Sequence, residues 1–177
     1  EPLQFSNIPG YFPTPAAVIA QMIEWADLPA EPFDWLEPEA GSGAILDAVS
    51  LAAPHGRLYA YERHCSLRDI LQRKGYALDG SDFLEAEPVA RVDRVLMNPP
   101  FENLQDVEHV RHTAKMLRPG GVLVSVMSPS AFYRSDAKSR AFRDWFDSIG
   151  GEKTELPSGS FKASGTSVET VLIRIAV

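Results

Sequence analysis

Cysteine is almost absent from this sequence of 177 residues, and so are long apolar runs. Cys65 is the single cysteine, which makes an intramolecular disulfide impossible and a cysteine-based zinc site unexpected. No window holds the roughly 18 uninterrupted apolar residues that a membrane-spanning helix needs, and the first residues lack the pattern of a signal peptide. We therefore expect one globular domain, residues 1–177, located in the cytoplasm.

Basic residues are scarce, since 17 lysines and arginines face 24 aspartates and glutamates, for a net charge of −7. This balance argues against a protein that binds nucleic acid through bulk electrostatics. The charge is unevenly distributed, because residues 111–143 hold seven basic residues and one acidic residue, which gives this segment +6 and the rest −13. Such asymmetry is typical of one basic face, although two solvated helix faces would give the same composition.

Apolar periodicity alternates between helix and strand along almost the whole chain. It predicts helices at residues 15–26, 44–53, 67–74, 106–117 and 139–149. It predicts strands at residues 32–37, 56–62, 92–97, 121–127, 152–156 and 168–175, and a weak one at 76–78. This order indicates an α/β fold, with a mostly parallel Rossmann-like sheet between two helical layers. The last two strands lack a helix between them and are expected to form an antiparallel C-terminal hairpin.

Polar side chains stand where these strands end. They are Glu37, Glu62, Asn98 and, after the weak strand, Asp82. Ligands of such sheets bind beyond the carboxyl ends of the strands, so these residues are candidates for a binding site. Any one of them alone is weak evidence, because simple topology also places polar residues at strand ends.

A glycine turn follows the first strand in "LEPEAGSGAI", residues 36–45. Gly41 and Gly43 allow a ligand to approach the backbone closely. The third glycine of a dinucleotide-binding motif is missing, because Leu46 takes its place. Glu37 and Glu39 also crowd a loop that would have to accept a pyrophosphate, so a cationic ligand suits this loop better.

The later strand ends complete a nucleoside pocket without phosphates. Glu62 can accept hydrogen bonds from both hydroxyls of a ribose. Asp82 can bind an adenine amine, and Phe83 can pack on the face of that base. A nucleoside with a positive charge near the glycine turn is what S-adenosylmethionine presents.

On these residues the chain resembles the class I S-adenosylmethionine-dependent methyltransferases. "NPPF", residues 98–101, is similar to the motif of the branch that methylates exocyclic base amines, especially N6 of adenine; relatives with tyrosine in the last place also methylate a glutamine amide in release factors. "YFPTP" at 11–15, "LRPGGVLVSVM" at 117–127 and "GSFKASGTSVETVLIRI" at 159–175 extend the resemblance over almost the whole chain. In the last of these, Phe161 is implied to pack on the flipped base. The resemblance implies S-adenosylmethionine as cofactor, bound by Tyr11, Phe12, Thr14, Pro15, Glu37, Ala40, Gly41, Gly43, Glu62, Asp82, Phe83 and Asn98.

The motif also has a physical rationale that does not depend on the resemblance. An adenine amine is a poor nucleophile, because its lone pair is delocalised into the ring. If the Asn98 side-chain oxygen and the Pro99 carbonyl accept its two hydrogens, the nitrogen can pyramidalise as charge develops. Pro99 and Pro100 stiffen the turn, and Phe101 offers a ring on which the base can stack. The predicted catalytic residues are therefore Asn98, Pro99, Pro100 and Phe101.

The chain departs from this family in two respects. Glu39 stands where a small residue is common, and no segment is long enough for the target-recognition domain that reads base edges. Residues 128–140, with Phe132, Tyr133 and several basic residues, are either a nucleic-acid grip or a plain surface crossover. A partner protein that supplies target recognition is one way to compensate.

Four hypotheses follow. The first is N6 methylation of adenine in DNA, and the others are adenine methylation in RNA, glutamine methylation in a protein, and a non-catalytic subunit of a methyltransferase complex. Cytosine C5 methylation is excluded, because the loop after the fourth strand has no cysteine. No metal site is expected, and all four histidines are interpreted as surface or packing residues.

Overall fold

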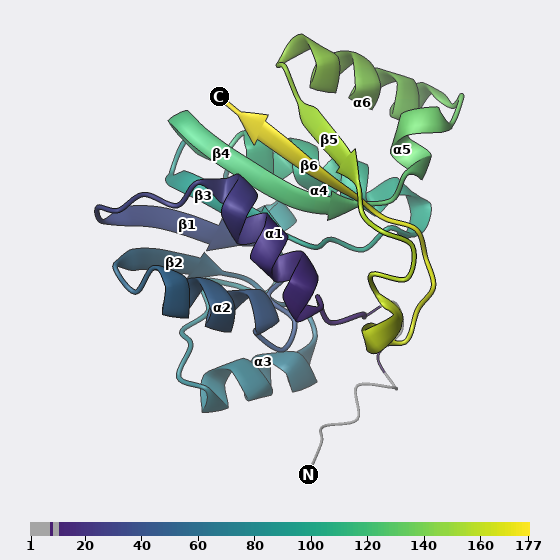
Figure 1. The fold of residues 1–177 in the computed structure, drawn as a ribbon. Coiled ribbons are helices and arrows are strands. Elements are labelled where there is room, and N and C mark those ends of the chain that lie inside the picture. Colours follow the sequence, from purple (N-terminus) through teal and green to yellow (C-terminus); the bar gives the residue numbers. More distant parts are fainter. Residues whose placement is uncertain (1–7, 9–10) are drawn as a thin grey trace.

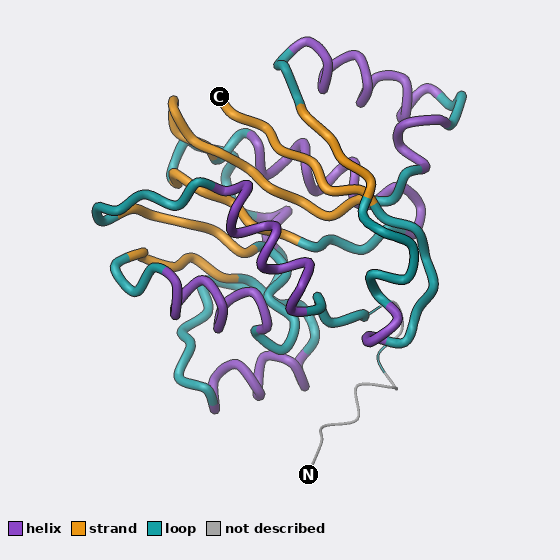
Figure 2. Tube along the Cα trace, in the orientation of Figure 1, coloured by secondary structure: helices purple, strands orange, loops and turns teal. Residues whose placement is uncertain are grey.

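The computed structural model describes residue 8 and residues 11–177, which form one six-stranded sheet with helices on both faces (Figures 1 and 2). The strand order is β2-β1-β3-β4-β6-β5. The strands are β1 (Phe33–Glu37), β2 (Gly56–Ala60), β3 (Val92–Met97), β4 (Leu117–Met127), β5 (Glu152–Glu155) and β6 (Val171–Ala176). The first four are parallel, and β6 runs antiparallel to both β4 and β5. The predicted α/β class and the antiparallel C-terminal pair are confirmed.

Two hydrophobic cores cover the two faces of this sheet. Successive residues of a strand point to opposite faces, so Trp35 packs in one core and Leu36 in the other. In Figure 1, α1 (Ala16–Ala26) and α2 (Ala44–Ala52) lie in front of the sheet and α4 (Gln105–Ala114) lies behind it. The remaining helices are α3 (Cys65–Arg73), α5 (Ser130–Tyr133) and α6 (Ala137–Ser148). Because both faces are covered, the inner strands β1, β3, β4 and β6 are mostly buried, whereas the edge strand β5 is polar and largely exposed.

The weak strand predicted at residues 76–78 does not form. Beyond the end of β2 only one isolated bridge, between Tyr61 and Gly80, continues the pairing. The Ala60 amide of β2 donates instead to a side-chain carboxylate, Asp79 Oδ2, at 2.8 Å. This side-chain contact satisfies a backbone group of β2 that a further strand would otherwise pair.

Other element boundaries shift by a few residues. The helix predicted to reach residue 117 ends at Ala114, and β4 begins at Leu117, because Leu117 pairs with Val92 before a register shift. α6 begins two residues before its predicted start, where Asp136 Oδ1 accepts a hydrogen bond from the Ser139 amide at 2.9 Å. The short helix α5 was not predicted. In the part of the chain that is described, no helix is both long and apolar enough to cross a membrane.

Candidate functional site

A cavity of about 830 Å³ opens beyond the carboxyl ends of the parallel strands. Its wall contains most of the residues predicted from the sequence: Tyr11, Phe12, Thr14, Ala40, Gly41, Glu62, Asp82, Phe83, Asn98, Pro99, Pro100 and Phe101. Three predicted residues lie behind this wall. Pro15 directly precedes α1, Gly43 directly precedes α2, and Glu37 is fully buried at the end of β1.

The glycine turn carries the ring of Tyr11 on its surface. Tyr11 Oη donates to Ser42 Oγ at 2.8 Å and accepts from the Ser42 amide at 2.9 Å. Gly41 has a φ of +60°, and a Cβ atom there would lie 2.7 Å from Tyr11 Cε2. Glycine is therefore needed at position 41 for its left-handed backbone and for the close approach of Tyr11.

Glu62 is held with both carboxylate oxygens in fixed directions. The Gly41 amide donates to Oε2 at 2.7 Å, and the His64 amide donates to Oε1 at 2.8 Å. A carboxylate has about four acceptor positions, so each oxygen retains capacity for a ligand hydroxyl. Glu62 is thus preorganised in the cavity wall as a paired acceptor.

Asp82 and Phe83 form the neighbouring part of the wall. Asp82 Oδ1 accepts from the Leu84 amide at 3.0 Å, at the start of the short 3-10 helix η1 (Phe83–Glu85). The Phe83 ring makes edge contacts with two histidines of α4, His109 at a centroid distance of 4.9 Å and His112 at 5.6 Å. The orientation of this aromatic wall is therefore set by α4.

Asn98 follows β3 directly and contacts the segment that precedes α1. Its Nδ2 donates to Thr14 Oγ1 at 3.0 Å, and none of the residues that the structure describes donates to its Oδ1. Two residues shortly after the motif, Asn103 (φ 54°) and Leu104 (φ 58°), have left-handed backbones. Such strain persists where the surroundings enforce it, and it often marks functional sites. Leu104 is buried, so the packing around its side chain helps to hold this backbone conformation.

Two glutamates place unsatisfied acceptors at the bottom of the glycine turn. Glu37 Oε1 accepts from the Glu39 amide at 3.1 Å, and Glu39 Oε1 pairs with Nδ1 of His109. The Oε2 atoms of both glutamates are buried and have no hydrogen-bond partner among the described residues. Buried acceptors without partners are rare, so a ligand that brings donors or positive charge fits here.

Burial also shifts the ionisation of both carboxyls. It raises the pKa of Glu37 well above its usual value, and the negative charge of Glu39 adds to this effect. Burial likewise raises the pKa of Glu39, while the hydrogen bond with His109 lowers it in part. Negative charge at this end of the cavity therefore costs free energy until a counter-charge is present.

The sequence did not point to His109 as a cavity residue. It was interpreted as a surface or packing residue, and it does pack on Phe83, but it also lines the cavity and pairs with Glu39. Gln105 lines the cavity as well, four residues earlier on α4. Gln105 and His109 are four residues apart and therefore share a helix face, but the helix was predicted to begin only at residue 106, so this pair was not evident from the sequence. Phe161, which the resemblance implied would pack on the flipped base, lines the cavity too. Among the described residues, no group of three or more histidines, cysteines or carboxylates could hold a metal ion.

The strand order and the cavity at the strand ends allow comparison with known structures. A putative class I S-adenosylmethionine-dependent methyltransferase from Listeria monocytogenes matches with a TM-score of 0.69 and 13% identity, over 92% of this chain and 60% of that chain. This chain has the class I methyltransferase fold. A chain of a type I R-M system matches with a TM-score of 0.78 and 20% identity, over 94% of this chain and 42% of that chain.

A putative RNA methyltransferase from Pyrococcus horikoshii matches with a TM-score of 0.63 and 18% identity, over 93% of this chain and 85% of that chain. No protein-family model and no curated protein sequence matches this chain. This chain spans less than two thirds of the first two structures above. At these identities the likeness concerns the fold, and the chemistry has to be argued from the site.

Proposed function

We propose that this protein is an S-adenosylmethionine-dependent methyltransferase that methylates the exocyclic N6 amine of adenine in DNA. The observation that carries the proposal is the position of Asn98. It lies at the end of β3 in the same cavity as Glu62 and Asp82, and its amide nitrogen is engaged by Thr14. One amide oxygen therefore remains for a substrate amine, beside a pocket suited to a nucleoside.

The residues of the cavity fit the cofactor. A volume of about 830 Å³ lies within the range of roughly 300–1,000 Å³ that ligand pockets occupy. Glu62 would bind the ribose hydroxyls, and Asp82 and Phe83 the adenine. The unsatisfied oxygen of Glu39, in the cavity wall, would lie toward the positive charges of the cofactor, with Glu37 buried outside the wall. When bound, the cofactor supplies an electrophilic methyl group.

The chain's own contribution to the reaction is to hold the amine. Asn98 Oδ1 and the Pro99 carbonyl accept its two hydrogens, so the nitrogen lone pair turns out of the plane of the base. Pro99 and Pro100 have no amide hydrogen and keep the turn stiff, so these acceptors are in place before the substrate arrives. The rings of Phe101 and Phe161, both in the cavity wall, hold the base by stacking.

Target recognition is expected to come from a partner protein. The described residues form the sheet, its helices and their connections, and no separate unit that could read base edges is seen among them. A type I R-M system, one chain of which matches this fold, is a complex. A partner of this kind is part of the proposal.

The test combines binding and transfer in one preparation. We expect S-adenosylhomocysteine to bind by calorimetry, and labelled methyl groups to reach N6 of adenine in unmethylated genomic DNA, as shown by nucleoside digestion and mass analysis. Methyl transfer to RNA would instead support the hypothesis of RNA adenine methylation, and transfer to a protein glutamine would support the hypothesis of protein methylation. Binding without any transfer would favour a non-catalytic subunit, and no binding would end the cofactor assignment.

Asn98→Ala should lower methyl transfer by at least about 100-fold, which is the cost of removing one preorganised hydrogen-bonding group, and should leave S-adenosylhomocysteine binding largely intact. Gln72→Ala is the matched control. It removes an exposed carboxamide of α3 that is not part of the cavity wall, and it should leave transfer unchanged. Full activity of Asn98→Ala would show that the proposed mechanism is wrong.

A further inference from the structure

The segment after β4 begins in the cavity wall and ends on the surface. Ser128 lines the cavity, and its amide donates to Asp106 Oδ2 of α4 at 2.9 Å. The Ser130 amide donates to Ser128 Oγ at 3.2 Å, and Ser130 Oγ lies 3.3 Å from Tyr133 Oη. A continuous series of polar contacts thus links the cavity to Tyr133.

The helix α5 presents Tyr133 to solvent. The ring of Phe132 packs edge-on against Phe142 and Phe146, at centroid distances of 5.6 and 5.4 Å. Arg143 Nη1 donates to the Ala131 carbonyl at 3.0 Å and fixes α5 to α6. Tyr133 itself is 72% exposed. Phe132 therefore anchors the helix, and the exposed ring of Tyr133 is not needed for packing.

Basic residues are concentrated in the sequence around Tyr133. Residues 128–143 contain four basic residues and one acidic residue, in a chain whose net charge is −7. Arg134 Nε lies 3.1 Å from Asp136, and Lys138 Nζ lies 3.9 Å from Glu108. Arg140 is exposed and forms no ion pair with any described residue. Asp136 also accepts from Ser139 at the start of α6, so much of its charge is engaged there.

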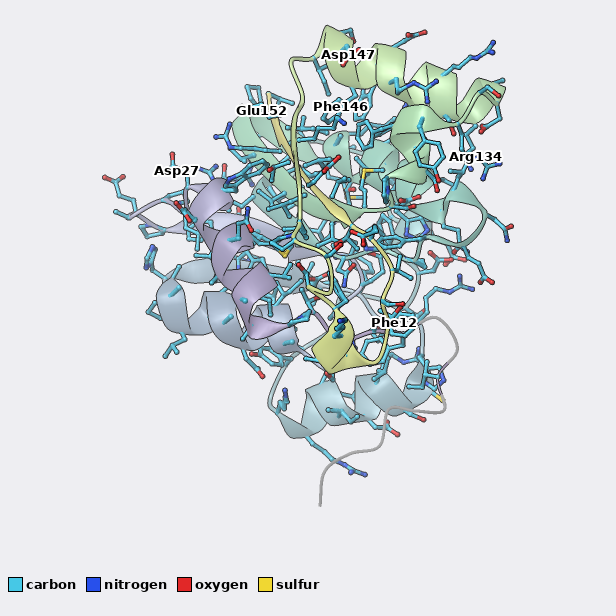
Figure 3. All side chains as sticks on the ribbon, turned by 45° about the vertical axis from the view of Figure 1, so that its right-hand side comes forward. Phe12, Asp27, Arg134, Phe146, Asp147 and Glu152 are labelled. Atoms are coloured by element: carbon cyan, nitrogen blue, oxygen red, sulfur yellow. The ribbon has the colours of Figure 1, made fainter. Side chains whose placement is uncertain are left out.

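Residues 128–140 continue directly from the cavity wall. Ser128 lines the cavity, and α5 begins two residues later. Figure 3 shows Arg134 toward the same side of the molecule as Phe12, which lines the cavity and is 40% exposed, with Asp27 on the opposite side. We therefore expect a strand with one base in the cavity to pass close to α5.

We infer that residues 128–140 bind the DNA strand that flanks the target adenine. The exposed ring of Tyr133 stacks on a base next to the target, and Arg134, Lys138 and Arg140 contact phosphates. An exposed aromatic ring among cations is the combination that holds unpaired nucleotides without reading their sequence. The inference rests on the proposed function, and it adds a surface on which the DNA is held outside the cavity.

The experiment measures binding of a fluorescein-labelled single-stranded DNA by fluorescence anisotropy, with S-adenosylhomocysteine present and the salt concentration varied. Tyr133→Ala should raise the dissociation constant at least about fivefold, the lower end of the effect of removing a stacking ring. Arg140→Ala should reduce the slope of log Kd against log salt by about 0.7, as one phosphate contact is lost. Both variants should bind S-adenosylhomocysteine as the wild type does.

Two exposed residues on other helices serve as matched controls. Leu51→Ala removes an apolar side chain of α2 that is 87% exposed, and Arg73→Ala removes an exposed cation at the end of α3. Neither should change DNA binding.

Wild-type affinity in Tyr133→Ala and Arg140→Ala would overturn the inference, as would a wild type that binds RNA of the same sequence and not DNA. Methyl transfer to DNA by the wild type is measured separately. The anisotropy experiment therefore tests the DNA contacts of residues 128–140, and the transfer experiment tests the proposed function, so failure of one can be told from failure of the other.

Discussion

Glu37 is the residue whose ionisation should influence the stability of the free protein most clearly. Its pKa is raised by burial, so the folded chain holds its proton more tightly than the unfolded chain does. As the pH rises from the usual value of 4.5 toward the raised value, the unfolded chain loses its proton first, and stability falls through that window.

Glu37→Gln removes the buried charge and should raise the melting temperature of the ligand-free protein at neutral pH, while changing it little below pH 4.5. The same variant should bind S-adenosylmethionine more weakly, because a negative charge one residue before the cavity wall, which begins here at Pro38, is lost. Thermal unfolding over a pH series, with and without the ligand, measures both effects. A stability difference that is the same at every pH would contradict the assignment of the effect to ionisation.

Glu39 and His109 should be energetically coupled, because their side chains pair in a part of the protein where each is largely buried, with exposed fractions of 19% and 7%. A double-mutant cycle with Glu39→Gln, His109→Ala and the double variant should give a coupling of roughly 0.5–3 kcal/mol in urea unfolding. Additive effects of the two substitutions would show that the contact contributes nothing.

At the scale of the element, the loop between β1 and α2 depends on Gly41. Gly41→Ala should strain the left-handed backbone and displace the ring of Tyr11, so S-adenosylhomocysteine affinity should fall at least about tenfold, an effect of about 1.4 kcal/mol. Gly75→Ala is the control, since its φ of +93° imposes a similar backbone strain, but nothing lies within 4 Å of its added Cβ. Both variants should lose stability, and only the first should lose affinity in calorimetry.

Local patterns carried most of the information about these elements. Buried parallel strands have apolar runs, and helices begin and end at recognisable residues, so the order of elements and the strand ends at Glu37 and Asn98 were predictable. The weak strand predicted at residues 76–78 did not form, and the Ala60 amide bonds to the Asp79 side chain instead. The apolar periodicity of a sequence does not reveal a contact of this kind. The pairing of Glu39 with His109 joins residues 70 positions apart, so it depends on how the loop and α4 meet in three dimensions.

At the scale of the whole molecule, ligand binding should stabilise the fold against unfolding. A ligand at 100 times its dissociation constant adds about 2.7 kcal/mol, which corresponds to roughly 5–10 °C in the melting temperature of a protein of this size. We expect this shift with S-adenosylhomocysteine in a thermal scan. Glu62→Ala should reduce the shift strongly, because the paired acceptor for the ribose is lost. An undiminished shift would place the ligand elsewhere.

The position of β6 within the sheet sets the order in which the molecule can be completed on the ribosome. β5 has β6 as its one sheet neighbour, and β4 needs β6 to pair its edge along residues 122–127. Until residues 171–176 leave the exit tunnel, a nascent chain therefore exposes an open, apolar strand edge. Such edges promote aggregation, so the interval before those residues emerge is when chaperones have most to protect.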